Sequence, residues 1–258
     1  MATAIRYSEQ VIDCSPEEWE ARVDLAACYR AAYAMGWNKS IIYNHITLRV
    51  PGTEHFLINP FGMMYSEITA SNLIKIDWDG NKLSNSEWPV LKQGFVVHSA
   101  VHRVRDDISC VIHTHSKAGV SVACQADGLL PLSLESMAFT DRIAYYDVQG
   151  VTDDEDEREA MARALGDKRF MILRNHGLLV GGNGIAQAFH DMAALELACE
   201  YQVTALAGGV PLSHPPIEVA RKSAEQIERN SEGMSGAARA HWAAVRRWMD
   251  RIDPSYAH

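Results

Sequence analysis

Two histidines separated by one residue, His113 and His115, end the apolar run Cys-Val-Ile-His-Thr-His-Ser at residues 110–116. Imidazole is a common ligand of divalent metal ions. Side chains alternate between the two faces of a strand, so both imidazoles project from the same side if residues 108–115 are extended. The spacing therefore indicates either a metal-binding pair or two imidazoles that only happen to fall close together.

A third histidine, His176, follows the apolar segment 170–173 and precedes Gly177, which permits a tight turn and a close backbone approach. Three neutral imidazoles that leave one or two coordination positions open are typical of a catalytic rather than a structural metal site. The alternative is that these histidines bond buried backbone groups or face solvent. The remaining histidines, His45 and His102 among them, have no comparable partner in the sequence, with His98 as an exception.

Other chemistries have weaker support in the sequence. It contains no Gly-x-Ser-x-Gly nucleophile motif, no phosphate-binding Walker motif and no His-Glu-x-x-His motif. The glycines at 181–184 do not form the Gly-x-Gly-x-x-Gly pattern of a dinucleotide-binding loop. Metal chemistry at the histidines is therefore favoured by elimination as well as by pattern.

The composition is that of an ordinary globular protein. The 258 residues are 47% apolar and 22% charged, with a net charge of −9, which opposes binding to nucleic acid. The apolar stretches are too short or too interrupted by charge to span a bilayer, and the N-terminus lacks the apolar core of a signal peptide. The five scattered cysteines indicate neither a disulfide framework nor a cysteine zinc site. We expect a cytoplasmic protein without nucleic-acid or membrane partners.

Helices and short strands alternate through the middle of the chain. Ser15-Pro16-Glu17-Glu18 predicts the start of a helix that ends near Gly36. The remaining pattern predicts strands at 46–50, 56–59, 73–77, 108–112, 143–146 and 170–173, and helices at 93–105, 120–126, 152–165 and 185–207. This order favours one α/β domain at 15–207, preceded by an extension at 1–14 and followed by a helical extension at 208–258 that packs on the same domain.

Several blocks of the sequence together resemble the class II aldolase/adducin family, in the branch closer to adducin. The matching blocks run in the family's order over roughly residues 15–207, and they are residues 44–51, 58–62, 66–69, 128–133 and 173–178, with His98 followed fifteen residues later by His113-Thr-His115. Each block is short, and their joint order carries the resemblance.

The resemblance implies a three-layer α/β/α fold around a mixed, largely antiparallel sheet, assembled as a homotetramer with sites near the subunit interfaces. It also implies that His113, His115 and His176 hold a divalent ion, zinc first and manganese or iron as alternatives. Such an ion stabilises the enediolate formed when a carbon–carbon bond breaks or a proton leaves. The residues implied to contact the small-molecule substrate are Asn44, Phe61, Gly62, His98 and Asn175.

Two departures from the family pattern concern the chemistry. Sugar-phosphate aldolases carry an acid/base carboxylate four residues before the histidine that matches His98, and here that position is Gly94. Glu87 is the alternative base, but to match the family's carboxylate it requires an insertion of about seven residues before His98. The alternative interpretation of Glu87 is an exposed glutamate that opens a helix. Phe61 replaces a hydroxyl residue of the phosphate-binding relatives, which disfavours phosphate and favours a flatter or more apolar substrate.

A tyrosine near the C-terminus, Tyr256, is the second candidate proton donor, because some family members borrow such a residue from a neighbouring subunit. The alternative is an exposed tyrosine on a frayed terminus. The leading hypothesis is a metal-dependent carbon–carbon lyase, of aldolase or decarboxylase type, acting on a small non-phosphorylated hydroxy-carbonyl or hydroxy-aromatic acid. The rivals are an adducin-like binding module without turnover, a sugar epimerase or dehydratase, and an Fe(II) oxygenase.

Overall fold

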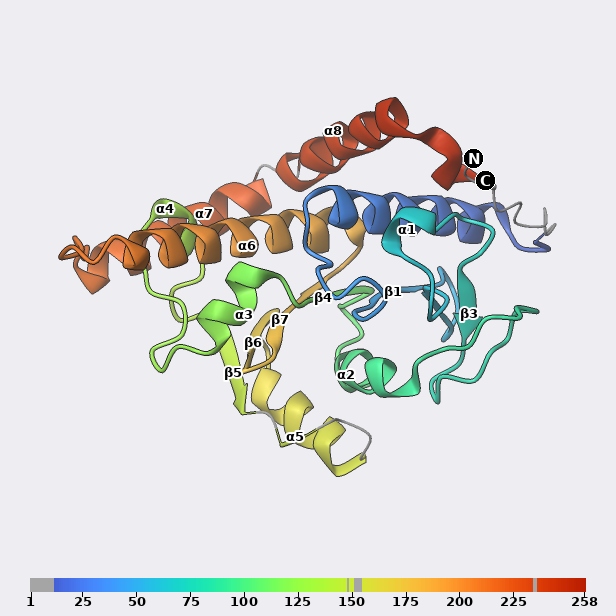
Figure 1. Ribbon diagram of the computed structural model, residues 1–258, viewed down its shortest axis with the longest axis horizontal. Coiled ribbons are helices and arrows are strands. Elements are labelled where there is room, and N and C mark those ends of the chain that lie inside the picture. The colour runs from blue at the N-terminus through green and yellow to red at the C-terminus, as the bar shows by residue number, and fades with distance from the viewer. Residues whose placement is uncertain (1–11, 148, 151–154, 234–235) are drawn as a thin grey trace.

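A seven-stranded mixed sheet forms the centre of the protein (Figure 1). The computed structural model describes residues 12–147, 149–150, 155–233 and 236–258. The strands are ordered β3-β2-β1-β4-β7-β6-β5, and of the neighbouring pairs in this part of the chain only β5 and β6 run parallel. The prediction of a mixed, largely antiparallel sheet is confirmed. The strands are β1 (Ile46–Arg49), β2 (Phe56–Ile58), β3 (Ile74–Ile76), β4 (Cys110–Thr114), β5 (Ile143–Asp147), β6 (Phe170–Arg174) and β7 (Gly177–Gly182).

Helices cover both faces of the sheet, so the α/β/α layering is also confirmed (Figure 1). The long helices α1 and α6 lie on one face, and α2 and α5 lie on the other. The helix α8 packs on α1 and α6 and adds an outer layer there. The helices are α1 (Pro16–Ala34), α2 (Lys92–His102), α3 (Lys117–Ala123), α4 (Leu134–Met137), α5 (Glu155–Leu165), α6 (Ile185–Ala207), α7 (Ile217–Gly233) and α8 (Ala237–Ile252), with short 3₁₀ helices η1 (Tyr65–Glu67) and η2 (Pro254–Ala257).

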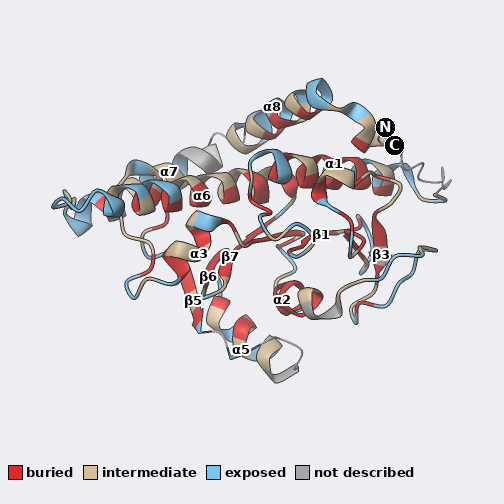
Figure 2. Ribbon diagram, in the orientation of Figure 1, coloured by how far each residue is buried: buried red, intermediate tan, exposed pale blue. Residues whose placement is uncertain are grey.

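The two faces of β4 point into two different cores. Cys110 and Ile112 belong to the core shared with α1 and α6, whereas Val111 between them belongs to the core shared with α2 and α5. Figure 2 shows that buried residues fill the sheet and the helix sides that face it. By this alternation His113 points toward α2 and Thr114 toward α6.

Most element positions agree with the sequence prediction, and two are shifted. The strand expected at 108–112 lies at 110–114, because its ladder is set by pairing with residues 178–182 of β7. The helix expected at 120–126 lies at 117–123, because the Ser116 hydroxyl caps it by accepting from the Gly119 N–H at 2.9 Å. The N-cap of α1 is Ser15, as predicted, and accepts from the Glu18 N–H at 3.2 Å.

The ends of the chain bear on the predicted domain division. Residues 1–11 of the expected N-terminal extension, and the helix cap expected at Thr152, lie outside the described residues. The helical residues after 208 pack on the domain through Trp242, Val245 and Met249 of α8, which are buried. In the described part of the chain, no helix combines the length and the apolar character needed to cross a membrane.

One tyrosine ties helix α1 to the strands that lead to the candidate site. The Tyr29 hydroxyl is fully buried and accepts hydrogen bonds from the backbone N–H groups of Ile46 (2.9 Å) and Asn59 (3.2 Å). Ile46 begins β1, and Asn59 directly follows β2. The hydroxyl therefore satisfies two buried donors at once.

Replacing Tyr29 by Phe should lower the free energy of unfolding by about 1–3 kcal/mol, because two buried N–H groups lose their acceptor. The measurement is urea unfolding followed by circular dichroism. Tyr33, one turn later on α1 and 51% exposed, provides the matched control. Equal stability of Tyr29→Phe and Tyr33→Phe would contradict the structural role assigned to the Tyr29 hydroxyl.

Candidate metal centre

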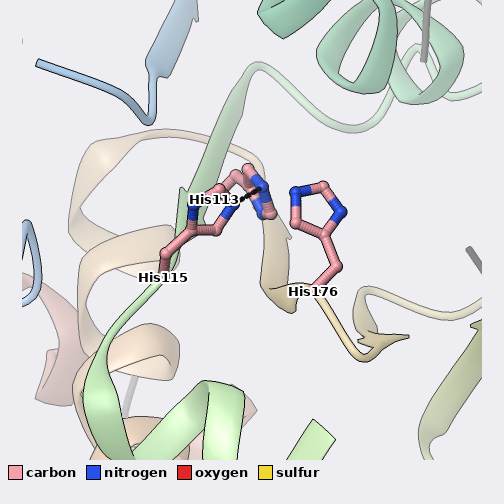
Figure 3. A group of neighbouring side chains, drawn as sticks. All are labelled: His113, His115 and His176. Atoms are coloured by element: carbon pink, nitrogen blue, oxygen red, sulfur yellow. Dashed lines mark hydrogen bonds between the residues drawn. The ribbon is translucent and has the colours of Figure 1, made fainter. Parts of the chain in front are cut away.

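The three histidines singled out in the sequence lie together at one end of the sheet (Figure 3). His113 is in β4, His115 directly follows that strand, and His176 lies in the turn between β6 and β7. Their ring centroids are 4.6 Å (His113–His115), 4.8 Å (His113–His176) and 4.6 Å (His115–His176) apart. One nitrogen from each imidazole lies within 4.8 Å of the other two. The structure therefore brings together the three histidines that the sequence predicted to be metal ligands.

Antiparallel pairing of β4 with β7 brings the histidines together. Thr114 pairs with Leu178, and β7 begins at Gly177, directly after His176. A Cβ atom on Gly177 would lie 2.3 Å from the Thr114 carbonyl oxygen and 2.9 Å from the His115 ring. Only glycine therefore permits this approach of the two chain segments.

Hydrogen bonds orient two of the three rings. The His113 Nδ1–H donates to the Leu178 carbonyl oxygen at 2.8 Å, which leaves the Nε2 lone pair free to face the other imidazoles. The His115 Nε2 lies 2.8 Å from that His113 Nε2. The Asn44 side-chain amide lies against His115, with one of its two polar atoms 2.8 Å from the His115 backbone nitrogen and the other 3.0 Å from His115 Nδ1.

Burial keeps the three imidazoles neutral at physiological pH. It places the pKa of His113 well below its usual range, with the neighbouring His115 and His176 adding to the effect. Burial also lowers the pKa of His115 to about 4 and lowers the pKa of His176. A metal ion binds the neutral form of imidazole, so no proton has to be displaced from a histidinium at pH 7.

The donor set fits a divalent transition metal. Imidazole nitrogens bind such ions at about 2.0–2.1 Å, so bound nitrogens lie roughly 3.4 Å apart in a tetrahedral arrangement. Here the His113 and His115 Nε2 atoms are 2.8 Å apart, and one nitrogen from each of the three rings lies within 4.8 Å of the others, so the separations bracket that value. Three imidazoles would hold the ion and leave at least one position for a ligand oxygen.

A buried carboxylate supports the strand that carries the histidines. Glu196 on α6 accepts from the Thr114 and Ser116 hydroxyls, each at 2.5 Å, and these residues flank His115. Burial raises the pKa of Glu196 to about 7. Sequence analysis missed this residue, because nothing in a long apolar helix indicates which strand end its one buried glutamate faces.

Sequence analysis also missed a second group of imidazoles next to the first. His45, His98 and His102 are all buried. The Thr47 hydroxyl lies 2.9 Å from both His98 Nδ1 and His102 Nε2, and the His98 ring centroid lies 6.4 Å from that of His113. The interpretation that His45 and His102 lack a partner was therefore wrong. The four-residue spacing of His98 and His102 on one helix was the available signal.

The residues expected to contact substrate differ in their burial and in their distance along the chain from the three histidines. Asn44 is buried and its amide lies against His115, so it positions that ring, and its contact with substrate stays a prediction. Phe61 and Gly62 form an adjoining turn, with the Phe61 ring 5.8 Å from that of Tyr43. Asn175 is exposed beside His176. The roles of Phe61, Gly62, His98 and Asn175 stay predictions.

Glu87 lies on the loop between β3 and α2 and is exposed. It does not open a helix, because α2 begins at Lys92. The neighbouring Trp88 ring packs 3.2 Å from the position of a Cβ on Gly62, so the loop borders the 61–62 turn. Gly94 lies in the first turns of α2.

Tyr256 is not available as a proton donor, which corrects the sequence prediction. Its side chain is 1% exposed, and its hydroxyl donates to Asp250 at 2.5 Å and accepts from Arg246 at 3.1 Å. The backbone of η2 is fixed by the bond from the Ala70 N–H to the Tyr256 carbonyl. The ring packs in the core of the α1 and α6 face, whereas His113 points to the opposite face of the sheet.

Residues 23–203 match the class II aldolase and adducin N-terminal domain. The chain belongs to this family. A crystal structure of an aldolase II superfamily protein from Pseudomonas syringae is 45% identical, with a TM-score of 0.91 over 95% of this chain and 98% of that chain. The predicted family is confirmed.

Two other relatives show how different the members of the aldolase and adducin family are. L-fuculose 1-phosphate aldolase from Glaciozyma antarctica is 26% identical, with a TM-score of 0.79 over 93% of this chain and 92% of that chain. Alpha-adducin of Mus musculus is 44% identical over 72% of this chain, but the match spans only 26% of adducin. This chain is therefore similar both to an aldolase of about its own length and to one part of a much longer protein, alpha-adducin.

Removal of one imidazole should abolish metal retention by this class II aldolase family member. We expect His113→Ala and His176→Ala to retain less than about a tenth of the metal bound by the wild-type protein after dialysis, because two imidazoles hold a divalent ion far more weakly than three. Elemental analysis by mass spectrometry measures the metal. His214→Ala, which changes an exposed histidine between α6 and α7, is the control. Equal metal content in all variants would place the ion elsewhere.

Glu196 should give the protein a distinctive dependence of stability on pH. Its pKa of about 7 in the folded protein lies above the ordinary value of 4.5, so the folded state binds the proton more tightly. The corresponding contribution to stability is complete below about pH 4.5 and is lost as pH rises toward 7, a total on the order of 3 kcal/mol. Glu196→Gln should remove this contribution.

The measurement is urea unfolding of the metal-free protein at pH 5 and pH 8. The buried histidines contribute a slope of the opposite sign in every variant, so the difference between Glu196→Gln and wild type isolates the glutamate. Glu200→Gln, on the exposed side of α6, is the control. A difference that does not change between the two pH values would contradict the assignment.

Proposed function

We propose that this protein is a divalent-metal-dependent carbon–carbon lyase, of aldolase or decarboxylase type. The observation that carries the proposal is the convergence of three neutral imidazoles, His113, His115 and His176, at one end of the sheet. Zinc is our first choice of metal, and manganese and iron are alternatives that the same imidazoles accept. When bound, such an ion polarises a carbonyl and stabilises the negative charge that develops as a carbon–carbon bond breaks.

The surroundings of the centre favour a small substrate without a phosphate group. Phosphate sites in proteins present backbone N–H groups or cationic side chains. The Tyr43 ring, next to Asn44, lies 5.8 Å from the Phe61 ring, and the Trp88 ring packs against Gly62. We expect these three rings to line the approach to the centre. A hydroxy-ketone or a hydroxy-aromatic acid suits an aromatic wall of this kind. Glu87 on the same loops is our candidate for moving the proton.

Assembly into a homotetramer, with sites near the subunit interfaces, is part of the same proposal. Ile41 and Tyr43 are 59% and 51% exposed, and they lie three residues and one residue before Asn44, which contacts His115. Large exposed apolar side chains gathered near a site are typical of a surface covered by another subunit. We also propose a cytoplasmic location, because the five cysteines are all unpaired, as expected in a reducing compartment.

The rival function is an adducin-like binding module without turnover, and the 44% identity to alpha-adducin over 72% of this chain keeps this rival open. A module that only binds a protein partner gains no stability from three converging, desolvated imidazoles, since each loses its hydration. An epimerase, a dehydratase or an Fe(II) oxygenase would use the same imidazoles for a different outcome.

A substrate screen tests the proposal. Hydroxy-ketones and hydroxy-aromatic acids should release aldehyde or carbon dioxide with the zinc- or manganese-loaded wild-type protein, and release should fall at least about a hundredfold with His113→Ala. Aldehyde is followed by a coupled reductase assay and carbon dioxide by isotope release. Oxygen consumption in parallel identifies the oxygenase. A metal-loaded protein that turns over none of these compounds would support the binding module.

A further inference from the structure

Two imidazoles next to the three-histidine centre each keep one nitrogen without a partner. The Nε2 atoms of His45 and His98 are buried and have no hydrogen-bond partner among the described residues. Both side chains are almost completely buried, at 2% and 0% exposed. Buried polar atoms in folded proteins are nearly always bonded, so two neighbouring exceptions call for a physical reason.

The hydrogen bond at the other side of the His45 ring makes its Nε2 an acceptor. His45 Nδ1 lies 2.9 Å from the Asn59 Oδ1, and an amide oxygen can only accept. Two further bonds hold Asn59. Its side-chain amide nitrogen donates to the Pro60 carbonyl at 3.4 Å, and its backbone N–H donates to the Tyr29 hydroxyl. The His45 proton therefore lies on Nδ1, and the Nε2 carries a lone pair.

A chain of hydrogen bonds makes the His98 Nε2 an acceptor as well. The chain ends at the Ile108 carbonyl, which can only accept and lies 3.3 Å from His102 Nδ1. His102 Nε2 then accepts from the Thr47 hydroxyl, and the Thr47 oxygen accepts from His98 Nδ1–H, each at 2.9 Å. Because every step has one allowed direction, the free nitrogen of His98 also carries a lone pair.

A glycine on α2 lets the His45 ring pack against the helix that carries His98. A Cβ atom on Gly94 would lie 2.1 Å from Cδ2 and 2.2 Å from Nε2 of His45, so the imidazole takes the space of a side chain at position 94. Gly94 and His98 are four residues apart on one helix and lie on the same side of it. The ring centroids of His45 and His98 are 6.3 Å apart, and the second is 6.4 Å from that of His113.

Two acceptors cannot bond each other, so both need a donor from a third group. We propose that His45 and His98 form an acceptor pair that binds a hydroxyl group of the ligand held at the three-histidine centre, with the single O–H proton shared between the two Nε2 atoms in a three-centre hydrogen bond. This inference rests on the proposed function. It specifies the substrate class further: the oxygen atoms that chelate the metal must be accompanied by a hydroxyl on a neighbouring carbon.

The test compares two small chelators that differ by one hydroxyl group. Acetohydroxamate and glycolohydroxamate present the same metal-binding atoms, and only the second carries a hydroxyl on the adjoining carbon. Affinity is measured by titrating the Co²⁺-loaded protein and following the visible absorption of the ion. Wild-type protein should bind glycolohydroxamate about tenfold more tightly, as expected for one added hydrogen bond.

In His45→Ala the preference for the hydroxyl should fall to within about twofold of unity, while the affinity for acetohydroxamate stays unchanged. Gly94→Ala should have the same effect although it adds only a methyl group, because the Cβ expels the imidazole. His98→Ala is an independent test of the pair, because His98 lies on helix α2, and we expect it to lose the preference for the hydroxyl as well. The double variant His45→Ala/Gly94→Glu places a carboxylate acceptor in the vacated space and should recover the preference. His214→Ala is the control.

The outcomes separate this inference from the proposed function. Failure of the wild-type protein to bind Co²⁺, or to bind either hydroxamate, would overturn both. Binding of both hydroxamates with equal affinity would overturn the acceptor pair alone. The same would follow if the hydroxyl preference survived in both His45→Ala and His98→Ala. The visible spectrum of each Co²⁺-loaded variant shows whether its metal centre is intact.

Discussion

The pairing of β4 with β7 is the constraint on which the centre depends. Register decides which residues face one another, and a slip of one residue would turn His113 to the α6 face of the sheet. Gly177 maintains the pairing at its critical end, because the Thr114 carbonyl lies where a side chain would be. The same pairing places the Leu178 carbonyl beside His113 Nδ1, so one strand contact sets both the position and the tautomer of that imidazole.

The other imidazoles take their positions from elements far away in the sequence. Asn44 contacts both the backbone and the ring of His115, and Glu196 fixes the residues on either side of it. Tyr29 supports the strand ends next to Asn59, which in turn orients His45. Helix α1, helix α6 and the first strands are therefore tied to the centre through a few hydrogen bonds, and those of Tyr29 and Glu196 are buried.

Local sequence patterns were enough to predict part of the site. Strand alternation was enough to predict that His113 and His115 share a side, and the limits of α6 followed from its apolar pattern. The contacts of His45 and Glu196 could not be predicted, because they depend on which helix crosses which strand. Tyr256 is a different case. Its place near the chain end predicted either a proton donor for a neighbouring subunit or an exposed side chain, but the packing of η2 against α1 buries it.

The buried imidazoles also bear on whether this fold catalyses a reaction or only binds a partner. Loss of hydration lowers the pKa of His45, His98 and His113, so each ring is held neutral at a cost in stability. Apolar side chains of similar volume would pack the same space without that cost. Retaining two buried acceptors beside three converging ligands is consistent with a ligand that brings both a chelating group and a donor, which describes a hydroxylated substrate better than the surface of another protein.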